Sequence, residues 1–267
     1  MIKIFTYILT LLLLVTAGYG EDQWTGIKIM KEQENRHSST TEFTREKMIL
    51  TDKNGKKEER IFRKYIKEGF KMDVTGLLIV FDLPQSISGT ALLTWDNKKR
   101  ENDQWLYLPA KGDLQRIASG SKKGYFMGTD FTFEDMEPEH IDEYEYKILG
   151  IEKISKMDCW KIEALPVNKE VAKNSGYSKR ILYILKKLFI TVKIEFYDKR
   201  DVHSKTLIIS KLKKIDGDRY RPDISIMKNQ KTGHRTELQV MSRDIDTAMK
   251  SDYFLQRYIT TKRHMKE

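Results

Sequence analysis

The sequence predicts a mainly β protein of the α+β class, in which an antiparallel sheet curls into a barrel or half-barrel and helices cover one face. About ten or eleven short runs of alternating apolar and polar residues occur at hairpin spacing, bounded by turn residues. Only two or three segments have apolar residues at helical spacing, and they do not alternate with the strands, which disfavours a doubly wound parallel sheet.

Residues 1–20 are predicted to be a cleaved secretory signal. Lys3 precedes an apolar run over residues 4–15, which ends at small residues before Gly20. A membrane-spanning helix needs about 20 apolar residues, so this run fits a signal better, with cleavage after Gly20. Residues 21–267 contain no repeat or Pro/Gly/Ser-rich linker, so a single domain is expected. The lone cysteine, Cys159, cannot form an internal disulfide and is expected to be a buried small hydrophobe.

The first elements follow from periodicity and turn chemistry. Residues 24–36 have apolar side chains at helical spacing and predict an amphipathic helix. Asn54-Gly55 predicts the first hairpin, because both residues tolerate a positive φ. Residues 77–81 are apolar on both faces of a strand and must be covered on both sides.

The second half continues with hairpins. An acidic helix is expected over residues 134–146, and a short helix within residues 246–258 is expected to dock back onto the sheet. Between them, strands are expected over residues 159–165, 177–185, 188–197, 204–212, 220–227 and 236–241.

The charge balance leaves two interpretations open. Charged residues make up 33% of the chain and the net charge is +10. This favours an anionic partner, or it serves solubility alone. Basic residues alternate with acidic ones and no nucleic-acid-binding motif is present, so a nucleic-acid partner is not expected.

Catalytic motifs are incomplete. Ser119 and Lys122 match S-x-x-K, and residues 231–233 match K-T-G, as in serine penicillin-recognising enzymes. The serine sits in a Gly-rich basic loop instead of opening a buried helix, and no Ser-Asp-Asn element lies between the motifs. The five histidines are too far apart in sequence to suggest a zinc site. We therefore predict no enzymatic activity, no metal and no cofactor.

Aromatic residues concentrate within and beside residues 102–136. A curved sheet with an apolar concave face can hold an acyl chain, although the same residues could simply form the core. The predicted wall of an apolar cavity comprises Leu78, Val80, Trp95, Trp105, Tyr107, Phe126, Phe131 and Phe133. Lys122 and Lys123 are predicted to meet an anionic headgroup at its rim.

Four segments resemble one bacterial family. Residues 89–95 (GTALLTW), 103–109 (DQWLYLP), 126–131 (FMGTDF) and 231–236 (KTGHRT) are similar to the outer membrane lipoprotein-sorting proteins, which are related to the LolA/LolB carriers. The resemblance implies an unclosed antiparallel β-barrel with helices over an apolar concave face, a periplasmic location and no catalytic residues. It implies a carrier or chaperone that binds acyl chains of a lipid or lipoprotein for transport toward the outer membrane. The alternative is a periplasmic adaptor or sensor of an RND/MMPL-type inner-membrane transporter that carries no lipid itself.

Overall fold

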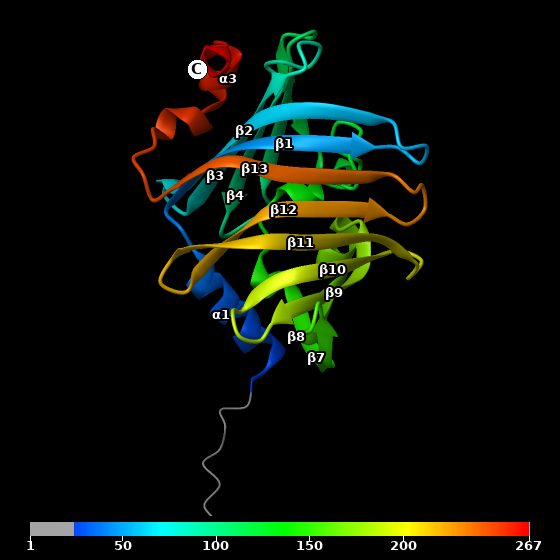
Figure 1. The fold of residues 1–267 in the computed structure, drawn as a ribbon. Helices are drawn as coiled ribbons and strands as arrows, with labels where there is room; N and C mark the ends of the chain where they lie inside the picture. Colours follow the sequence, from blue (N-terminus) through cyan, green and yellow to red (C-terminus); the bar gives the residue numbers. More distant parts are fainter. Residues whose placement is uncertain (1–23, 267) are drawn as a thin grey trace, which may run out of the picture.

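The computed structural model describes residues 24–266, which form one continuous sheet with short helices (Figure 1). The predicted signal, with its cleavage site after Gly20, lies outside the described residues. The thirteen strands are β1 (Thr41–Thr51), β2 (Lys57–Lys71), β3 (Val74–Leu83), β4 (Ala91–Asn97), β5 (Asp103–Leu108), β6 (Asp113–Ile117), β7 (Tyr144–Ile154), β8 (Met157–Pro166), β9 (Tyr177–Leu185), β10 (Ile190–Asp198), β11 (His203–Asp216), β12 (Arg219–Asn229) and β13 (Arg235–Ile245). The α-helices are α1 (Gly26–His37), α2 (Lys169–Asn174) and α3 (Gln256–Thr260).

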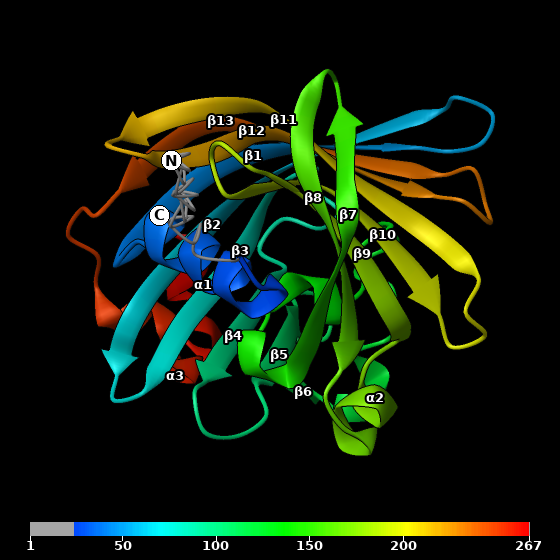
Figure 2. The same cartoon turned by 90° about the horizontal axis from the view of Figure 1, so that it is seen from below.

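The strand order explains why the sheet is open. The order is β6-β5-β4-β3-β2-β1-β13-β12-β11-β10-β9-β8-β7, and all neighbours are antiparallel. Strands pair with their neighbours in the chain except at one joint, where β1 pairs with β13. The ends of the sheet, β6 and β7, do not pair with each other, and the sheet curls around a hollow that contains α1 (Figure 2). The predicted fold class, an unclosed antiparallel half-barrel, is confirmed.

Two strands were missing from the predicted set, and one predicted helix was wrong. The missing strands are β6 and β7. The acidic helix expected over residues 134–146 is instead two single 3₁₀ turns, Glu134–Met136 and Ile141–Glu143, followed by β7. Pro138 interrupts the segment, and in β7 the half-buried Tyr144, Tyr146 and Ile148 alternate with exposed residues. Because Ile141 and Tyr144 are three apart, their spacing had imitated a helix.

The predicted first helix and first hairpin are confirmed. Helix α1 begins after Thr25, whose side chain accepts a hydrogen bond from Lys28 N at 3.4 Å. Its buried residues Ile29 and Met30 pack on the sheet with Trp160 and Ile162 of β8. The β1–β2 hairpin turns at Gly55, where φ is 85°.

The C-terminal segment, residues 246–266, covers the outer face of the sheet. It contains a 3₁₀ turn (Ser251–Phe254) and α3, which confirms the short docking helix expected at the tail. Phe254 and Tyr258 pack with Leu78 and Val80 of β3. The alternate β3 residues Ile79 and Phe81 belong to a cluster with Phe126 on the other face, the concave one. The run at residues 77–81 is therefore covered on both sides, as its sequence required.

Cys159 is fully buried, as predicted. Burial raises the pKa of its thiol, which keeps the sulfur protonated and unreactive at neutral pH. Within residues 24–266, no helix has the length and apolar content needed to cross a membrane.

Candidate functional site: a pocket beneath the bridging segment

The chain between β6 and β7, residues 118–143, has to connect the two opposite ends of the sheet. We call it the bridging segment. Beneath it lies a pocket of about 310 Å³, at the lower end of the range for small-molecule sites of about 300–1,000 Å³. Because the segment crosses the hollow instead of pairing as a hairpin, side chains must hold it against the concave face.

The floor of the pocket is apolar and comes from four neighbouring strands. It is lined by Tyr177 of β9, Ile194 and Phe196 of β10, Leu207 of β11 and Met227 of β12, with Phe131 of the bridging segment. The register explains the cluster. Ile194 lies directly opposite Leu207, and Leu207 lies opposite Met227, so their side chains share one face of the sheet.

A tight turn fixes the middle of the bridging segment. Phe126 N donates to Phe131 O at 2.7 Å, and Gly128 has a positive φ of 72°. The turn leaves Phe126 fully buried against Phe81 and Phe133. This part of the segment forms core beside the pocket.

Asp130 joins the bridging segment to β13 and the loop before it. Its Oδ2 accepts a hydrogen bond from Thr236 Oγ1 at 2.8 Å and lies 2.6 Å from His234 Nδ1. Two of the four segments that carry the family resemblance, residues 126–131 and 231–236, therefore meet in space. Their role in this contact is to position the bridging segment.

A buried ion pair anchors the segment over the pocket. Lys205 of β11 pairs with Asp135, and their side chains are 2% and 7% exposed. Lys205 Nζ also donates to Asp130 O at 3.2 Å and lies 5.0 Å from the ring centroid of Tyr177. Such a pair holds its position strongly, because removing one partner leaves an uncompensated buried charge.

The mouth of the pocket is rich in carboxylates. Glu134 accepts hydrogen bonds from Ser175 Oγ at 2.5 Å and Gly176 N at 2.7 Å, and burial raises the pKa of its carboxyl. Glu137 forms a 2.6 Å ion pair with Lys122, yet burial outweighs that pair and raises the pKa of Glu137 to about 7.

Arg180 forms part of the opposite wall. Its Nη1 donates to Glu139 Oε2 at 2.7 Å, and its guanidinium lies 4.1 Å from the ring centroid of Tyr144. Its Nη2 is buried and has no hydrogen-bond partner among the described residues.

The residues predicted to line an apolar cavity separate into two groups. Phe131 lines the pocket, and Phe126 and Phe133 lie in the core beside it. The other five pack beneath the C-terminal segment on the outer face: Leu78, Val80, Trp95, Trp105 and Tyr107. Trp95 Nε1 donates to Phe254 O at 2.7 Å, so even its polar atom is used by that contact. Contact of any of these residues with a ligand stays a prediction.

The two predicted rim lysines lie in different surroundings. Lys122 is buried at the pocket, where it pairs with Glu137 and donates to Asn102 O at 2.7 Å. Lys123 is exposed and donates to Lys173 O at the end of α2, at 2.7 Å. Contact of these lysines with an anionic headgroup also stays a prediction.

Sequence reasoning missed most of the floor. Ile194, Phe196, Leu207 and Met227 were recognised as strand residues, but alternation does not tell which face of a curved sheet is hollow. The rim carboxylates were interpreted as the start of a helix. The useful signal would have been that residues 118–143 connect the two end strands of the sheet, β6 and β7. Finding it requires the strand order, which the sequence patterns do not contain.

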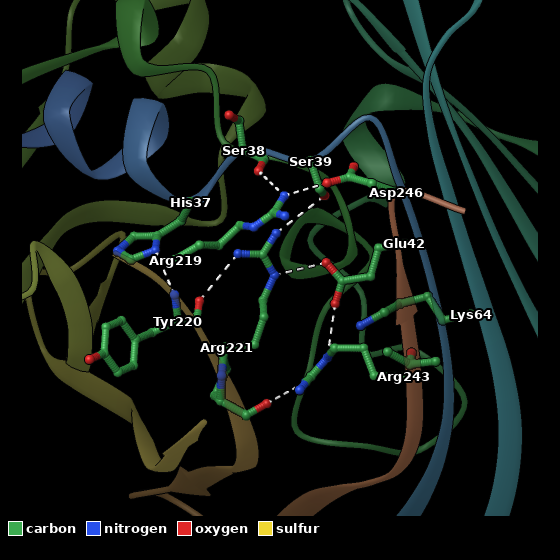
Figure 3. Close-up of polar contacts among 12 residues, drawn as sticks. His37, Ser38, Ser39, Glu42, Lys64, Arg219, Tyr220, Arg221, Arg243 and Asp246 are labelled. Carbon is green, nitrogen blue, oxygen red and sulfur yellow. Dashed lines mark hydrogen bonds and ion pairs between the residues drawn. The ribbon is translucent and has the colours of Figure 1, made fainter. Parts of the chain in front are cut away.

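Other polar clusters act as structural ties. In Figure 3, Glu42 of β1 accepts from Arg221 Nε at 2.9 Å and from Arg243 Nε at 3.2 Å, which links β1, β12 and β13 near the end of α1. The S-x-x-K and K-T-G fragments do not form one site, because Ser119 Oγ donates to Glu101 at 2.7 Å whereas Lys231 pairs with Asp198. Across residues 24–266, no three His, Cys, Asp or Glu side chains are grouped so that they could hold a metal ion.

Known proteins resemble the chain over most of its length. The family model that matches residues 74–261 has the description "-like: Uncharacterized protein". An outer membrane lipoprotein-sorting protein domain from Vibrio parahaemolyticus is 30% identical, with a TM-score of 0.82 over 88% of this chain and 98% of that one. A DUF1329 family protein from Desulfovibrio piger is 28% identical, also with a TM-score of 0.82, over 88% and 97%.

A LolA superfamily protein from Nitrosomonas europaea shares the fold, with a TM-score of 0.69 over 88% of this chain and 100% of that one, at 18% identity. No curated protein matched the sequence. The family model covers well over half of the chain, and the Vibrio domain is matched over nearly its whole length. The chain belongs to the family of outer membrane lipoprotein-sorting proteins.

Proposed function

We propose that the protein is a periplasmic carrier that binds an acyl chain of a lipid or lipoprotein in the pocket beneath the bridging segment. The observation that supports this most strongly is the apolar floor of β9–β12 beneath a covering segment that is not part of the sheet. Burial of each CH₂ group stabilises a bound chain by about 0.8 kcal/mol, so the floor supplies affinity without covalent chemistry. Movement of the bridging segment would admit and release the chain.

Export and location are part of the proposal. Residues 1–20 would direct the chain to the periplasm and be removed after Gly20. Residues 21–267 would then act as a single domain. The mass and N-terminal sequence of the protein recovered from a periplasmic extract test this, and an uncleaved chain would contradict it.

The binding test uses two substitutions on one strand. Leu207 faces the pocket and Ile208 faces outward, and both are half-buried residues of β11. We expect Leu207→Asp to reduce binding of a fluorescent acyl probe by tenfold or more, because a carboxylate would replace apolar floor. Ile208→Asp should leave the probe affinity nearly unchanged. Equal effects of the two variants would place the ligand elsewhere.

Mass spectrometry of lipids extracted from detergent-free protein gives the second test. Stoichiometric lipid supports the carrier. A protein that is reproducibly empty and binds no acyl probe would instead favour the adaptor or sensor of an RND/MMPL-type transporter.

A further inference from the structure

We infer that the pocket selects an amphiphile with a positively charged head over one with an anionic head. This inference rests on the proposed function and adds the charge of the ligand to it. It starts from the difference in charge between the mouth of the pocket and the whole chain. The chain has a net charge of +10, yet the charged residues that line this pocket are predominantly acidic.

The charge count at the pocket is one-sided. Seven carboxylates line it: Glu101, Glu134, Asp135, Glu137, Glu139, Glu143 and Glu170. Two basic side chains line it, Lys122 and Arg180, so the formal charge of the lining is 2 − 7 = −5. Asp135 is neutralised by Lys205, which lies outside the lining, and the remainder is −4 with every other carboxylate ionised. Because the pKa of Glu137 is raised to about 7, the remainder at neutral pH lies between −4 and −3.

The two basic residues of the lining are already occupied. Lys122 pairs with Glu137, and Arg180 pairs with Glu139. Glu101 accepts instead from uncharged donors, Ser119 Oγ at 2.7 Å and Asn174 Nδ2 at 2.5 Å. Uncharged donors satisfy the hydrogen-bonding capacity of a carboxylate but leave its charge uncompensated.

Glu134 also accepts from uncharged donors, the Ser175 hydroxyl and the Gly176 amide, but the charge of Arg180 acts on it as well. Glu143 and Glu170 are exposed and form no ion pair within the described part of the chain. Three carboxylates of the lining, Glu101, Glu143 and Glu170, therefore lack an ion-pair partner within the described part of the chain. A carboxylate or phosphate head would be repelled there, whereas an ammonium or guanidinium head would supply the missing charge.

The lining thus fits an acyl chain on its apolar floor and a cationic group beside its unpaired carboxylates.

The experiment compares three amphiphiles with the same alkyl chain by isothermal titration calorimetry at low ionic strength, below their micelle concentrations. The probes are dodecyltrimethylammonium, an uncharged dodecyl polyglycol ether and dodecyl sulfate. We expect the cationic probe to bind about tenfold more tightly than the uncharged one, and the anionic probe more weakly than both. The difference should shrink in 0.5 M salt, because the acids at the mouth are open to solvent.

A variant with a weakened rim and a matched control sharpen the result. Glu143→Gln with Glu170→Gln removes two unpaired carboxylates from the mouth and should lower affinity for the cationic probe about fivefold. Glu145→Gln with Glu163→Gln removes two carboxylates that do not line the pocket and should change nothing. A variant effect confined to the cationic probe supports the inference.

Failure of this inference can be distinguished from failure of the proposed function. If the three probes bind equally, or dodecyl sulfate binds most tightly, the preference for a cationic head is contradicted, but the proposed acyl carrier is not. Tight binding of dodecyl sulfate would support the predicted role of Lys122 and Lys123 toward an anionic head. If no probe binds, and Leu207→Asp and Ile208→Asp behave alike, the proposed function fails and this inference fails with it.

Discussion

The C-terminal segment and the bridging segment each cover one face of the same sheet, but they are held by different chemistry. The C-terminal segment inserts Phe254 and Tyr258 among the apolar side chains of β2–β5, where rings pack against rings. The bridging segment is held by the Lys205–Asp135 and Lys122–Glu137 ion pairs and leaves a pocket beneath it. The comparison teaches that aromatic packing is common to both covers, whereas buried ion pairs at the concave face accompany the cover that spans a pocket.

The largest expected effect tests the packing of the C-terminal segment. Phe254 is fully buried, and its ring lies against Gly76, where a Cβ would come within 2.4 Å of it. We expect Phe254→Ala to lower the free energy of unfolding by about 3–5 kcal/mol, measured by chemical denaturation, because it leaves a cavity. Gly76→Ala should also destabilise by displacing the ring. The exposed Thr260→Ala is the control.

The comparison fails if Phe254→Ala changes acyl-probe affinity as much as it changes stability. Folded protein of this variant should bind the probe as before, because the pocket lies on the other face of the sheet.

The next effect tests the charged anchor. Asp135→Asn leaves the buried Lys205 without its counter-charge and should lower the free energy of unfolding by about 3 kcal/mol. Unlike Phe254→Ala, it should also weaken probe binding, since Asp135 holds the bridging segment. Adding Lys205→Met to Asp135→Asn removes the stranded charge and should recover stability. The exposed Asp142→Asn in the same segment should have no effect.

A loss of less than about 1 kcal/mol for Asp135→Asn, with no recovery in the double variant, would show that the pair does not hold the segment.

The smallest expected effect appears in the pH dependence. Burial raises the pKa of Glu137 from 4.5 to about 7, so between these values the folded protein holds a proton that the unfolded chain has lost. Stability from this group is full below pH 4.5 and is lost as pH rises through 7. Because a tenfold change in proton affinity corresponds to about 1.4 kcal/mol, the loss is roughly 3 kcal/mol at most.

Glu137→Gln should therefore flatten the fall in unfolding free energy between about pH 5 and pH 8. The groups that interact with Glu137 are Lys122, Glu134, Asn102 and His140, and they remain in the variant. Glu143→Gln, a carboxylate of the exposed rim, provides the control. An unchanged slope in Glu137→Gln would mean that Glu137 titrates normally.

Sequence patterns predicted the fold better than the site. Hairpin spacing, the Asn54-Gly55 turn and the two-sided apolar run at residues 77–81 each depend on neighbours in the chain, and each prediction was confirmed. The largely exposed strand β7 was missed for two reasons. Half-buried and exposed residues alternate only over its first five positions, and the three-residue spacing of Ile141 and Tyr144 imitated a helix.

The site depends on contacts that no local pattern contains. Leu207 and Met227 face the pocket because of strand register and curvature, and Asp135 reaches Lys205 across 70 residues of sequence. Trp105 and Tyr107 looked suited to a ligand wall, but their face of the sheet is occupied by the tail of the same chain. A pattern of period two shows that two faces exist without showing what covers each one.

The pairing of β1 with β13 has a consequence for how the chain reaches this structure. Every other neighbouring pair in the sheet is consecutive in sequence and can close over a short loop, or over α2 between β8 and β9. The central joint must wait for the last strand, because its partners are separated by almost the whole sheet. A chain delivered N-terminus first can build β1–β6 as successive hairpins, but β1 remains an open edge until β13 arrives. The hollow, and with it the pocket, therefore comes into being only when the C-terminal end of the chain is available.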